Sequence, residues 1–318
     1  MPAPRNRELL VRVARMYYEE NLSQQEVAER LGLSRTNVSR ILTSAREQGI
    51  VDIRIRDLSL RDIALEDEIK SAFALAECRV VGGRGHDATL SQVGSAGAEW
   101  LLDTLRPEHR LSLSWGRTLQ ALVEAVRTDR VIPVEVLPLV GGLSSVASEI
   151  TGEELVRELA ARLGATSQRL HAPALLESAA SKETLLAEPA IASVLDAARR
   201  SSLSFVGIGA FGAGSSAAII DTLRLTPRQR QQFERARPVG DVCARYFDED
   251  GQPILGAVHD RVLAVSLEDL HAIPTVVGMA VGVEKARGVL GALRAGFMNV
   301  LICDSALGRA LLGMVRQE

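Results

Sequence analysis

The first fifty residues carry apolar positions at helical spacing, and they predict three helices. Residues 8–20 form the first, because one helical stripe in this range is apolar. Its members are Leu9, Leu10, Val13, Met16 and Tyr17. The second helix is expected to begin at the sequence SQQE, a capping box in which the Ser23 hydroxyl accepts from the amide of Glu26 while the Glu26 side chain accepts from the amide of Ser23.

A third helix is predicted beyond Gly32, which supplies the turn. Ser34 caps its start and Gly49 ends it. Its inner positions are Val38, Ile41 and Leu42, and its outer positions are Arg35, Thr36, Asn37, Ser39 and Arg40. A short helix, a Gly-containing turn and a second helix with this outer face match the helix-turn-helix pattern that enters the major groove of DNA.

The side chains on this face suit DNA. Arg can bridge two acceptors of guanine, Asn can bridge adenine, and a helix N-terminus with Ser or Thr hydroxyls can hold phosphates. The residues expected to contact DNA are Ser23, Gln24, Ser34, Arg35, Thr36, Asn37, Ser39 and Arg40. A three-helix module that binds another protein remains the alternative.

Residues 50–56, IVDIRIR, alternate apolar and charged side chains, which predicts a short half-buried strand. This strand either forms a wing beside the helices or leads into the linker LSLRD. We expect a DNA-binding domain over residues 1–56 and a larger domain over residues 57–318.

Beyond residue 57, apolar runs alternate with turns and amphipathic helices, which is typical of a parallel sheet with crossover helices. The predicted strands are residues 78–81, 111–114, 134–137, 204–208, 261–265, 275–281 and 300–303, and the predicted helices are 90–105, 118–126, 153–163 and 284–295. The fold class is therefore α/β, with a small helical domain ahead of a large Rossmann-like domain. Ligands of such sheets bind beyond the carboxyl ends of the strands.

Charge and composition sharpen this division. The chain has 318 residues and a net charge of −3, but residues 1–56 hold ten Arg and seven acidic residues, so the small domain is basic and the remainder acidic. Three Cys without a Cys-x-x-Cys pair favour neither disulfides nor a zinc finger. No signal peptide or apolar run of membrane-spanning length is visible, so we expect the cytoplasm, no membrane and no metal.

Two glycine turns follow predicted strands and are candidate ligand sites. In WGRTL, Gly116 permits a sharp turn, and Arg117 and Thr118 begin a helix whose free amides favour a phosphate. In LVGGL, Gly141 and Gly142 allow the backbone to approach a ligand closely. Each turn could equally be plain loop geometry.

A third glycine turn, GIGAFG, formally matches a dinucleotide-binding motif through Gly207, Gly209 and Gly212. The acidic residue expected about 20 residues later is absent, because that region reads TLRLTPRQRQQFERAR. A nicotinamide-sensing repressor is thus a minor alternative, and no cofactor is expected. Whether these glycines contact a ligand stays open.

Two charged residues follow further glycines. Asp241, beside Gly240, could accept hydrogen bonds from sugar hydroxyls or could simply cap a turn. Lys285, after VVGMAVG and near a helix start, suits an anion as a point charge, although a solvated lysine is the commoner finding.

Taken together, these segments resemble the SorC/DeoR-type sugar-binding transcriptional regulators over nearly the whole chain. The resemblance is carried by YYEENLSQQEVAERLGLSRTNVSRIL, WGRTL, the GG turn, GDVCARYFDEDG and EKARGVLGALRAGFMNVLICDSALGRALL. It implies an effector domain similar to sugar-phosphate isomerases and deaminases, a homo-oligomer that is typically a tetramer, and operator binding controlled by a phosphorylated sugar or polyol.

The resemblance also implies roles for single residues. Gly116, Arg117, Thr118 and Lys285 would hold the phosphate, Asp241 would contact the sugar, and the turn of Gly141, Gly142 and Leu143 would line the same pocket. Some relatives carry an Arg just before these glycines. Val140 stands there in this chain, which disfavours a second phosphate on the effector.

The sequence therefore predicts a DNA-binding regulator of carbohydrate metabolism with no catalytic residues. A sugar-phosphate isomerase or deaminase on the same fold remains possible, because fold alone does not settle function. The identity of the sugar, the operator sequence and the direction of regulation stay open.

Overall fold

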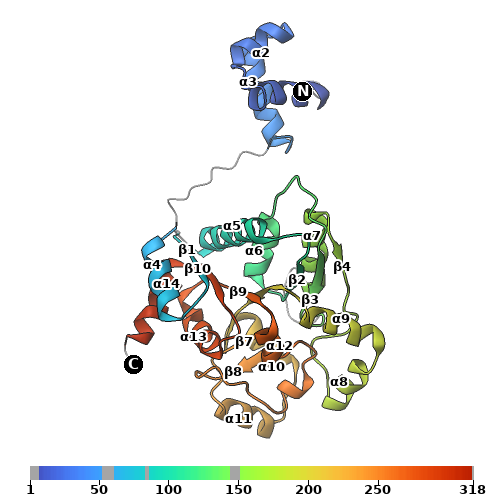
Figure 1. Cartoon of the computed structure of the whole chain (residues 1–318), viewed down its shortest axis with the longest axis vertical. Coiled ribbons are helices and arrows are strands. Elements are labelled where there is room, and N and C mark those ends of the chain that lie inside the picture. Colours follow the sequence, from blue (N-terminus) through green and yellow to red (C-terminus); the bar gives the residue numbers. More distant parts are fainter. Residues whose placement is uncertain (1–6, 52–60, 83–85, 144–150, 317–318) are drawn as a thin grey trace. The chain divides into compact units, whose positions relative to one another are not determined.

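The computed structural model describes residues 7–51, 61–82, 86–143 and 151–316 (Figure 1). Contacts divide the chain into two units, Met1–Leu58 and Ser59–Glu318. The boundary expected from the sequence, between residues 56 and 57, falls within residues 52–60, outside the described residues. Each unit is considered by itself.

The first unit contains three helices, α1 (Arg7–Tyr18), α2 (Gln24–Leu31) and α3 (Arg35–Glu47). The capping box at Ser23 is present, and Gly32 closes α2 with a left-handed φ of 63°. The Ser34 hydroxyl accepts from the Asn37 amide at 3.2 Å and starts α3. The apolar stripes meet in one buried cluster built from α1, α2 and α3, as their spacing predicts. Most of the strand expected over residues 50–56 lies outside the described residues.

The second unit is built on a seven-stranded sheet in the order β1-β10-β9-β5-β2-β3-β4, with every pair parallel. The strands are β1 (Glu77–Val81), β2 (Arg110–Leu113), β3 (Glu135–Pro138), β4 (Thr166–Ser167), β5 (Leu203–Gly207), β9 (Thr275–Ala280) and β10 (Val300–Asp304). The sequences of these strands are mostly apolar because helices cover both faces of a parallel sheet and bury the side chains on each face. The mixed α/β class predicted from the sequence is confirmed.

Helices cover both faces of this sheet (Figure 1). One face packs against α5, α6 and α7, and the other packs mainly against α4, α10, α13 and α14. In β9, Val277 and Met279 belong to the first cluster while Val276 and Ala280 belong to the second, as alternation along a strand requires. The helices are α4 (Ile63–Ala72), α5 (His86–Thr104), α6 (Arg117–Ala125), α7 (Gly152–Leu163), α8 (Ala179–Leu186), α9 (Pro189–Arg199), α10 (Gly214–Thr222), α11 (Pro227–Arg235), α12 (Leu267–Ala272), α13 (Ala286–Ala295) and α14 (Ser305–Val315).

A second, three-stranded antiparallel sheet was not predicted. It joins β6 (Gly209–Ala210), β7 (Gly240–Val242) and β8 (Arg245–Phe247). Cys243 and Ala244 connect β7 to β8 with φ values of 52° and 60°, a two-residue hairpin turn in which both residues are left-handed. This small sheet brings Asp241 back toward the end of β5.

The strand predicted over residues 261–265 is wrong. The chain there forms a 3-10 turn, η2 (His259–Arg261), followed by isolated bridges at Val262 and Ala264. The reason is the buried Arg245 guanidinium. It donates to carbonyl oxygens of this segment, which would otherwise accept from the amides of a neighbouring strand. Its acceptors are the carbonyl oxygens of His259 at 2.8 Å, Val262 at 3.2 Å, Ala264 at 3.0 Å and Val265 at 3.2 Å.

Candidate functional site

The sheet reverses its winding direction between β2 and β5. From β2 the chain moves to β3 on one side, whereas β5 lies on the other side of β2 and leads on to β9 and β10. Ligands of open α/β sheets bind at such a switch point, outside the carboxyl ends of the strands. A cavity of about 290 Å³ lies there, lined by residues that follow β2, β5 and β9.

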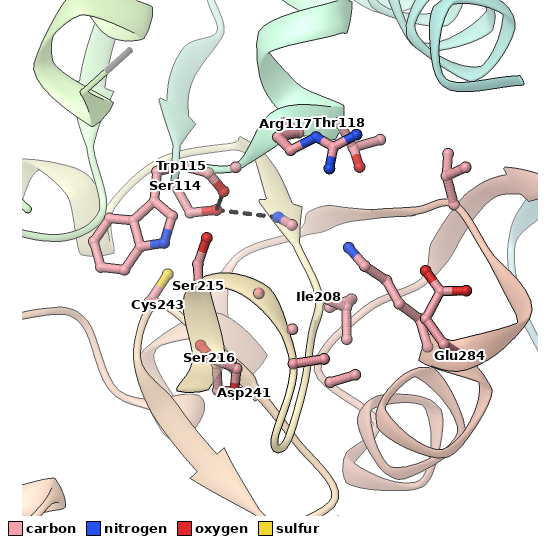
Figure 2. A pocket seen from close by; sticks show the side chains of 18 of the residues that line it. Ser114, Trp115, Arg117, Thr118, Ile208, Ser215, Ser216, Asp241, Cys243 and Glu284 are labelled. Carbon is pink, nitrogen blue, oxygen red and sulfur yellow. Dashed lines mark hydrogen bonds between the residues drawn. The ribbon is translucent and has the colours of Figure 1, made fainter. Parts of the chain in front are cut away.

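One wall of the cavity is the turn from β2 into α6. Gly116 is the N-cap of α6 with a φ of 128°, and no side chain caps this helix start. Arg117 and Thr118 are the first residues of α6, and both line the cavity (Figure 2). The Ser114 hydroxyl accepts from the Gly207 amide at 3.1 Å and so ties the end of β2 to the end of β5. An uncapped helix start beside an arginine suits an anion.

A second uncapped helix start faces the same cavity, and the sequence reasoning missed it. Gly214, Ser215 and Ser216 open α10 and line the cavity, and the N-cap Ala213 offers no side-chain acceptor. The signal available in the sequence was AGSSA, directly after GIGAFG. Figure 2 shows Ser216 beside Asp241, across the cavity from Arg117 and Thr118. Two helix N-termini therefore border one cavity.

Asp241 lies in β7 and is 5% exposed. Its Oδ1 atom has no hydrogen-bond partner among the described residues. Burial raises the pKa of this carboxyl to about 6, although hydrogen bonds from Ser216 and from the Ala244 amide and the charge of Lys285 lower it. A buried oxygen without a donor is costly, so a ligand hydroxyl that donates to it would gain a strong hydrogen bond.

Lys285 closes the short 3-10 helix η3 (Val283–Lys285) and is the N-cap of α13. Burial lowers the pKa of this lysine, and the charge of Arg117 adds to that effect, while Asp241 and Glu284 oppose it. All four charged residues line the cavity. The structure thus places Gly116, Arg117, Thr118, Asp241 and Lys285 in one site.

The glycines of GIGAFG take part in packing as well as in the cavity wall. Gly207 and Gly209 line the cavity. A Cβ on Gly207 would lie 2.9 Å from the Trp115 carbonyl, and one on Gly209 would overlap Oδ1 of Asp241. The motif leads into β6 and not directly into a helix, because α10 begins only at Gly214. This geometry does not favour dinucleotide binding, which needs the glycine turn to open a helix.

The second glycine turn lies apart from the cavity lining. Gly141, Gly142 and Leu143 are absent from the described residues that line it. A Cβ on Gly141 would lie 2.6 Å from the Ala172 carbonyl oxygen, and the Gly142 amide donates to that oxygen at 2.9 Å. Close packing of two backbone segments therefore explains Gly141. A ligand contact by this turn stays a prediction.

In the first unit, α3 presents the residues expected to read DNA. Arg35, Thr36, Ser39 and Arg40 are exposed and Asn37 is half-buried. The hydroxyls of Ser23 and Ser34 cap α2 and α3 by accepting from first-turn amides, and Gln24 is half-buried at the start of α2. Contacts of all these residues with DNA stay predictions.

Within the described ranges, no three metal-binding side chains gather into a cluster, and no helix is long and apolar enough to cross a membrane. Residues 59–313 match the family described as "Putative sugar-binding domain", and residues 8–65 match the Crp-like helix-turn-helix domain.

Relatives of known name extend over nearly the full chain. The deoxyribonucleoside regulator of Bacillus subtilis is 29% identical over 313 residues, covering 96% of this chain and 97% of that protein. The sorbitol operon regulator of Klebsiella pneumoniae is 30% identical over 312 residues, covering 96% and 97%. The crystal structure of the full-length sorbitol operon regulator SorC from Klebsiella pneumoniae matches with a TM-score of 0.81 and 28% identity, covering 97% of this chain and 99% of that chain. The chain therefore belongs to the SorC/DeoR-type family of sugar-binding transcriptional regulators, with a helix-turn-helix ahead of its sugar-binding domain.

Proposed function

We propose that this regulator binds its operator through α3 and that a phosphorylated sugar or polyol in the cavity controls that binding. One observation carries the proposal: the same cavity holds two uncapped helix starts with Arg117 and Lys285, which suit a phosphate, and the unsatisfied Oδ1 of Asp241, which suits a hydroxyl. A ligand with a phosphate and a hydroxyl would bind the helix starts through the first group and donate to Asp241 through the second. The names of the relatives, a sorbitol operon regulator and a deoxyribonucleoside regulator, agree with such a ligand.

The phosphate would lie against Gly116, Arg117 and Thr118, with Lys285 as a further cation. Asp241 would accept from a sugar hydroxyl. The cavity of about 290 Å³ is at the lower end of the range for small-molecule sites, which fits a single sugar unit better than a dinucleotide. The amides of Gly214 and Ser215 at the start of α10 would add donors that the sequence reasoning had not included.

On the DNA side, Arg35 and Asn37 would read bases while Ser23, Gln24, Ser34, Thr36, Ser39 and Arg40 would contact the backbone or neighbouring bases. Helix-turn-helix proteins read paired half-sites as oligomers, so we propose a homo-oligomer, with a tetramer as the family expectation. The cytoplasm, where operator DNA lies, is its place of action. Because the named relatives are regulators, we propose ligand binding without turnover.

A thermal-shift panel on the full chain tests the effector site. The panel contains ribose 5-phosphate, glucose 6-phosphate, fructose 6-phosphate, glucitol 6-phosphate, their unphosphorylated forms and inorganic phosphate. A true effector at about 100 times its Kd should stabilise the protein by about 2.7 kcal/mol. Lys285→Gln should weaken binding about 10- to 100-fold, because a hydrogen bond to a charged group contributes about 1.5–3 kcal/mol.

Lys182→Gln is the matched control, since it removes a lysine from α8, which contributes nothing to the cavity lining. Its effector Kd should equal that of the unsubstituted chain. Stabilisation by no member of the panel, or equal affinity of the Lys285→Gln variant, would count against the proposed site. Consumption of a sugar phosphate by the purified chain would instead favour an enzyme.

A further inference from the structure

The loop that carries Glu284 and Lys285 into the cavity is held at its first residue. Gly282 has a φ of 102° and starts η3, and its carbonyl accepts from the Lys285 amide at 3.1 Å. The Gly282 amide donates to Oδ1 of Asp304 at 2.8 Å. Asp304 is the last residue of β10 and is not among the residues that line the cavity.

The second oxygen of Asp304 begins another element. Oδ2 accepts from the amides of Ala306 at 3.2 Å and Leu307 at 3.3 Å and so caps α14. The side chain is buried, with the residue 5% exposed. One carboxylate therefore joins the Lys285 loop to the start of α14 through charge-assisted hydrogen bonds shielded from water.

Helix α14 in turn packs on α4, and the two lie side by side in Figure 1. A Cβ on Gly308 would lie 2.9 Å from Cδ1 of Ile69, so the helices approach as closely as glycine allows. Two ion pairs also join them, Arg309 with Asp62 at 3.5 Å and Arg316 with Glu68 at 2.8 Å. Helix α4 is the first helix after residues 52–60, which connect this unit to the DNA-binding unit.

We propose that Asp304 is a positioning residue that fixes the Glu284–Lys285 loop to α14, so that an effector held at Lys285 acts through α14 on α4, where the chain enters from the DNA-binding unit. This inference rests on the proposed function. A cap alone would need only one acceptor, and Ser or Asn would serve as well as Asp. The bond to Gly282 goes beyond capping, because it uses the oxygen that the helix does not need.

Asp304→Ser separates the two roles. The serine hydroxyl can still cap α14 but is too short to accept from Gly282 at the same time. The first measurement is hydrogen exchange of the unliganded full chain. Residues 282–285 should exchange at least tenfold faster in the variant, while the first turn of α14 keeps its protection. Unchanged exchange at residues 282–285 would overturn the proposal without any effector being known.

The second measurement is the factor by which a saturating effector changes the Kd for a duplex that the unsubstituted chain has selected from a random pool. The effector is the panel member above that stabilises the unsubstituted chain most. Asp304→Ser should reduce this factor at least fivefold toward one while the Kd for the duplex without effector stays within twofold. A retained factor would overturn the proposal, whereas no response of the unsubstituted chain would refute the proposed function instead.

Two further variants complete the test. Ser178→Ala removes the cap of α8, which contributes no residue to the cavity or to the α14–α4 contact, and should leave both measurements unchanged. If Asp304→Ser does not fold, Gly308→Ala introduces a methyl group between α14 and α4 without touching Asp304 or the cavity. The factor by which the effector changes the Kd for the duplex should differ at least threefold from that of the unsubstituted chain, while the Kd for the effector stays within twofold. An unchanged factor would overturn the proposal that the effector acts through α14 and α4.

Discussion

The buried carboxyl of Asp241 should make the stability of the sugar-binding domain fall as pH rises. Burial raises the pKa of Asp241 from its ordinary value of 3.8 to about 6. The fold therefore favours the protonated form, and the associated stabilisation is present below about pH 4 and is lost as pH rises through about 6. A difference of about 2 pKa units at 1.36 kcal/mol each corresponds to about 3 kcal/mol.

Asp241→Asn isolates this effect because the amide has the same shape and does not titrate. The free energy of unfolding is measured by urea denaturation between pH 4 and 6.5, followed by tryptophan fluorescence. Both tryptophans, Trp100 and Trp115, lie in the Ser59–Glu318 unit, so the signal reports on this domain alone. The value for the unsubstituted chain minus that for the variant should fall by most of about 3 kcal/mol over this range.

Asp269→Asn provides a control of opposite sign. Hydrogen bonds from Ser266 and the Arg199 guanidinium lower the pKa of Asp269, although burial alone would raise it. Its contribution to stability is therefore present above its ordinary pKa of 3.8 and is lost as pH falls below it, so the corresponding difference should rise by no more than about 0.3 kcal/mol between pH 4 and 6.5. A flat or rising difference for Asp241 would refute the description of its carboxyl as buried and unsatisfied.

Two further substitutions, the first with a control variant, test the two proposed binding surfaces. Gly209→Ala places a methyl group on Oδ1 of Asp241, so it should destabilise the domain by about 1–3 kcal/mol and abolish the effector thermal shift. Its control is Gly313→Ala, where the added Cβ meets open space. This variant should stabilise α14 by about 0.5–1 kcal/mol in the same urea denaturation. Arg35→Lys keeps the charge of α3 but loses the planar guanidinium. Measured by fluorescence anisotropy, discrimination between the selected duplex and its single mismatches should fall by about 1–3 kcal/mol, while the salt dependence of binding is retained. Equal discrimination would show that Arg35 contacts only phosphate.

Local signals predicted much of this fold. The capping box at Ser23 and the cap at Ser34 set helix starts within one or two residues of their observed places, because the partners lie three residues apart. The central strands were visible because parallel strands buried on both faces are nearly all apolar. The predicted strand over residues 261–265 failed because Arg245, whose contribution no local pattern reveals, donates to three of its carbonyl oxygens.

The small sheet behind Asp241 was missed for a related reason. Gly209 pairs with Asp241 across a long sequence separation. The hairpin that follows carries Cys243 and Ala244 at left-handed φ values, where Asn or Gly would normally announce the turn. Such a turn costs free energy and persists only because neighbouring contacts hold it. Among these contacts are the hydrogen bonds of Arg245, the next residue.

Exceptions to the capping rule point to the same cavity. Eight helices of the described chain begin with a Ser, Thr or Asp whose side chain accepts from the first turn: α2, α3, α4, α7, α8, α11, α12 and α14. The helices α6 and α10 lack such a cap, and their N-cap residues Gly116 and Ala213 both line the cavity. Helix α13 also lacks a side-chain cap, but it continues from η3, where the Ala286 amide donates to the Val283 carbonyl. Helix α9 also lacks a side-chain cap, and Pro189 in its first turn removes one donor. Free amides at a helix start are costly when buried, so two uncapped starts beside one cavity support the proposed anion site. The capping rule is kept at eight helix starts of the described chain and broken at two beside one cavity, which supports the proposed binding site independently of any motif.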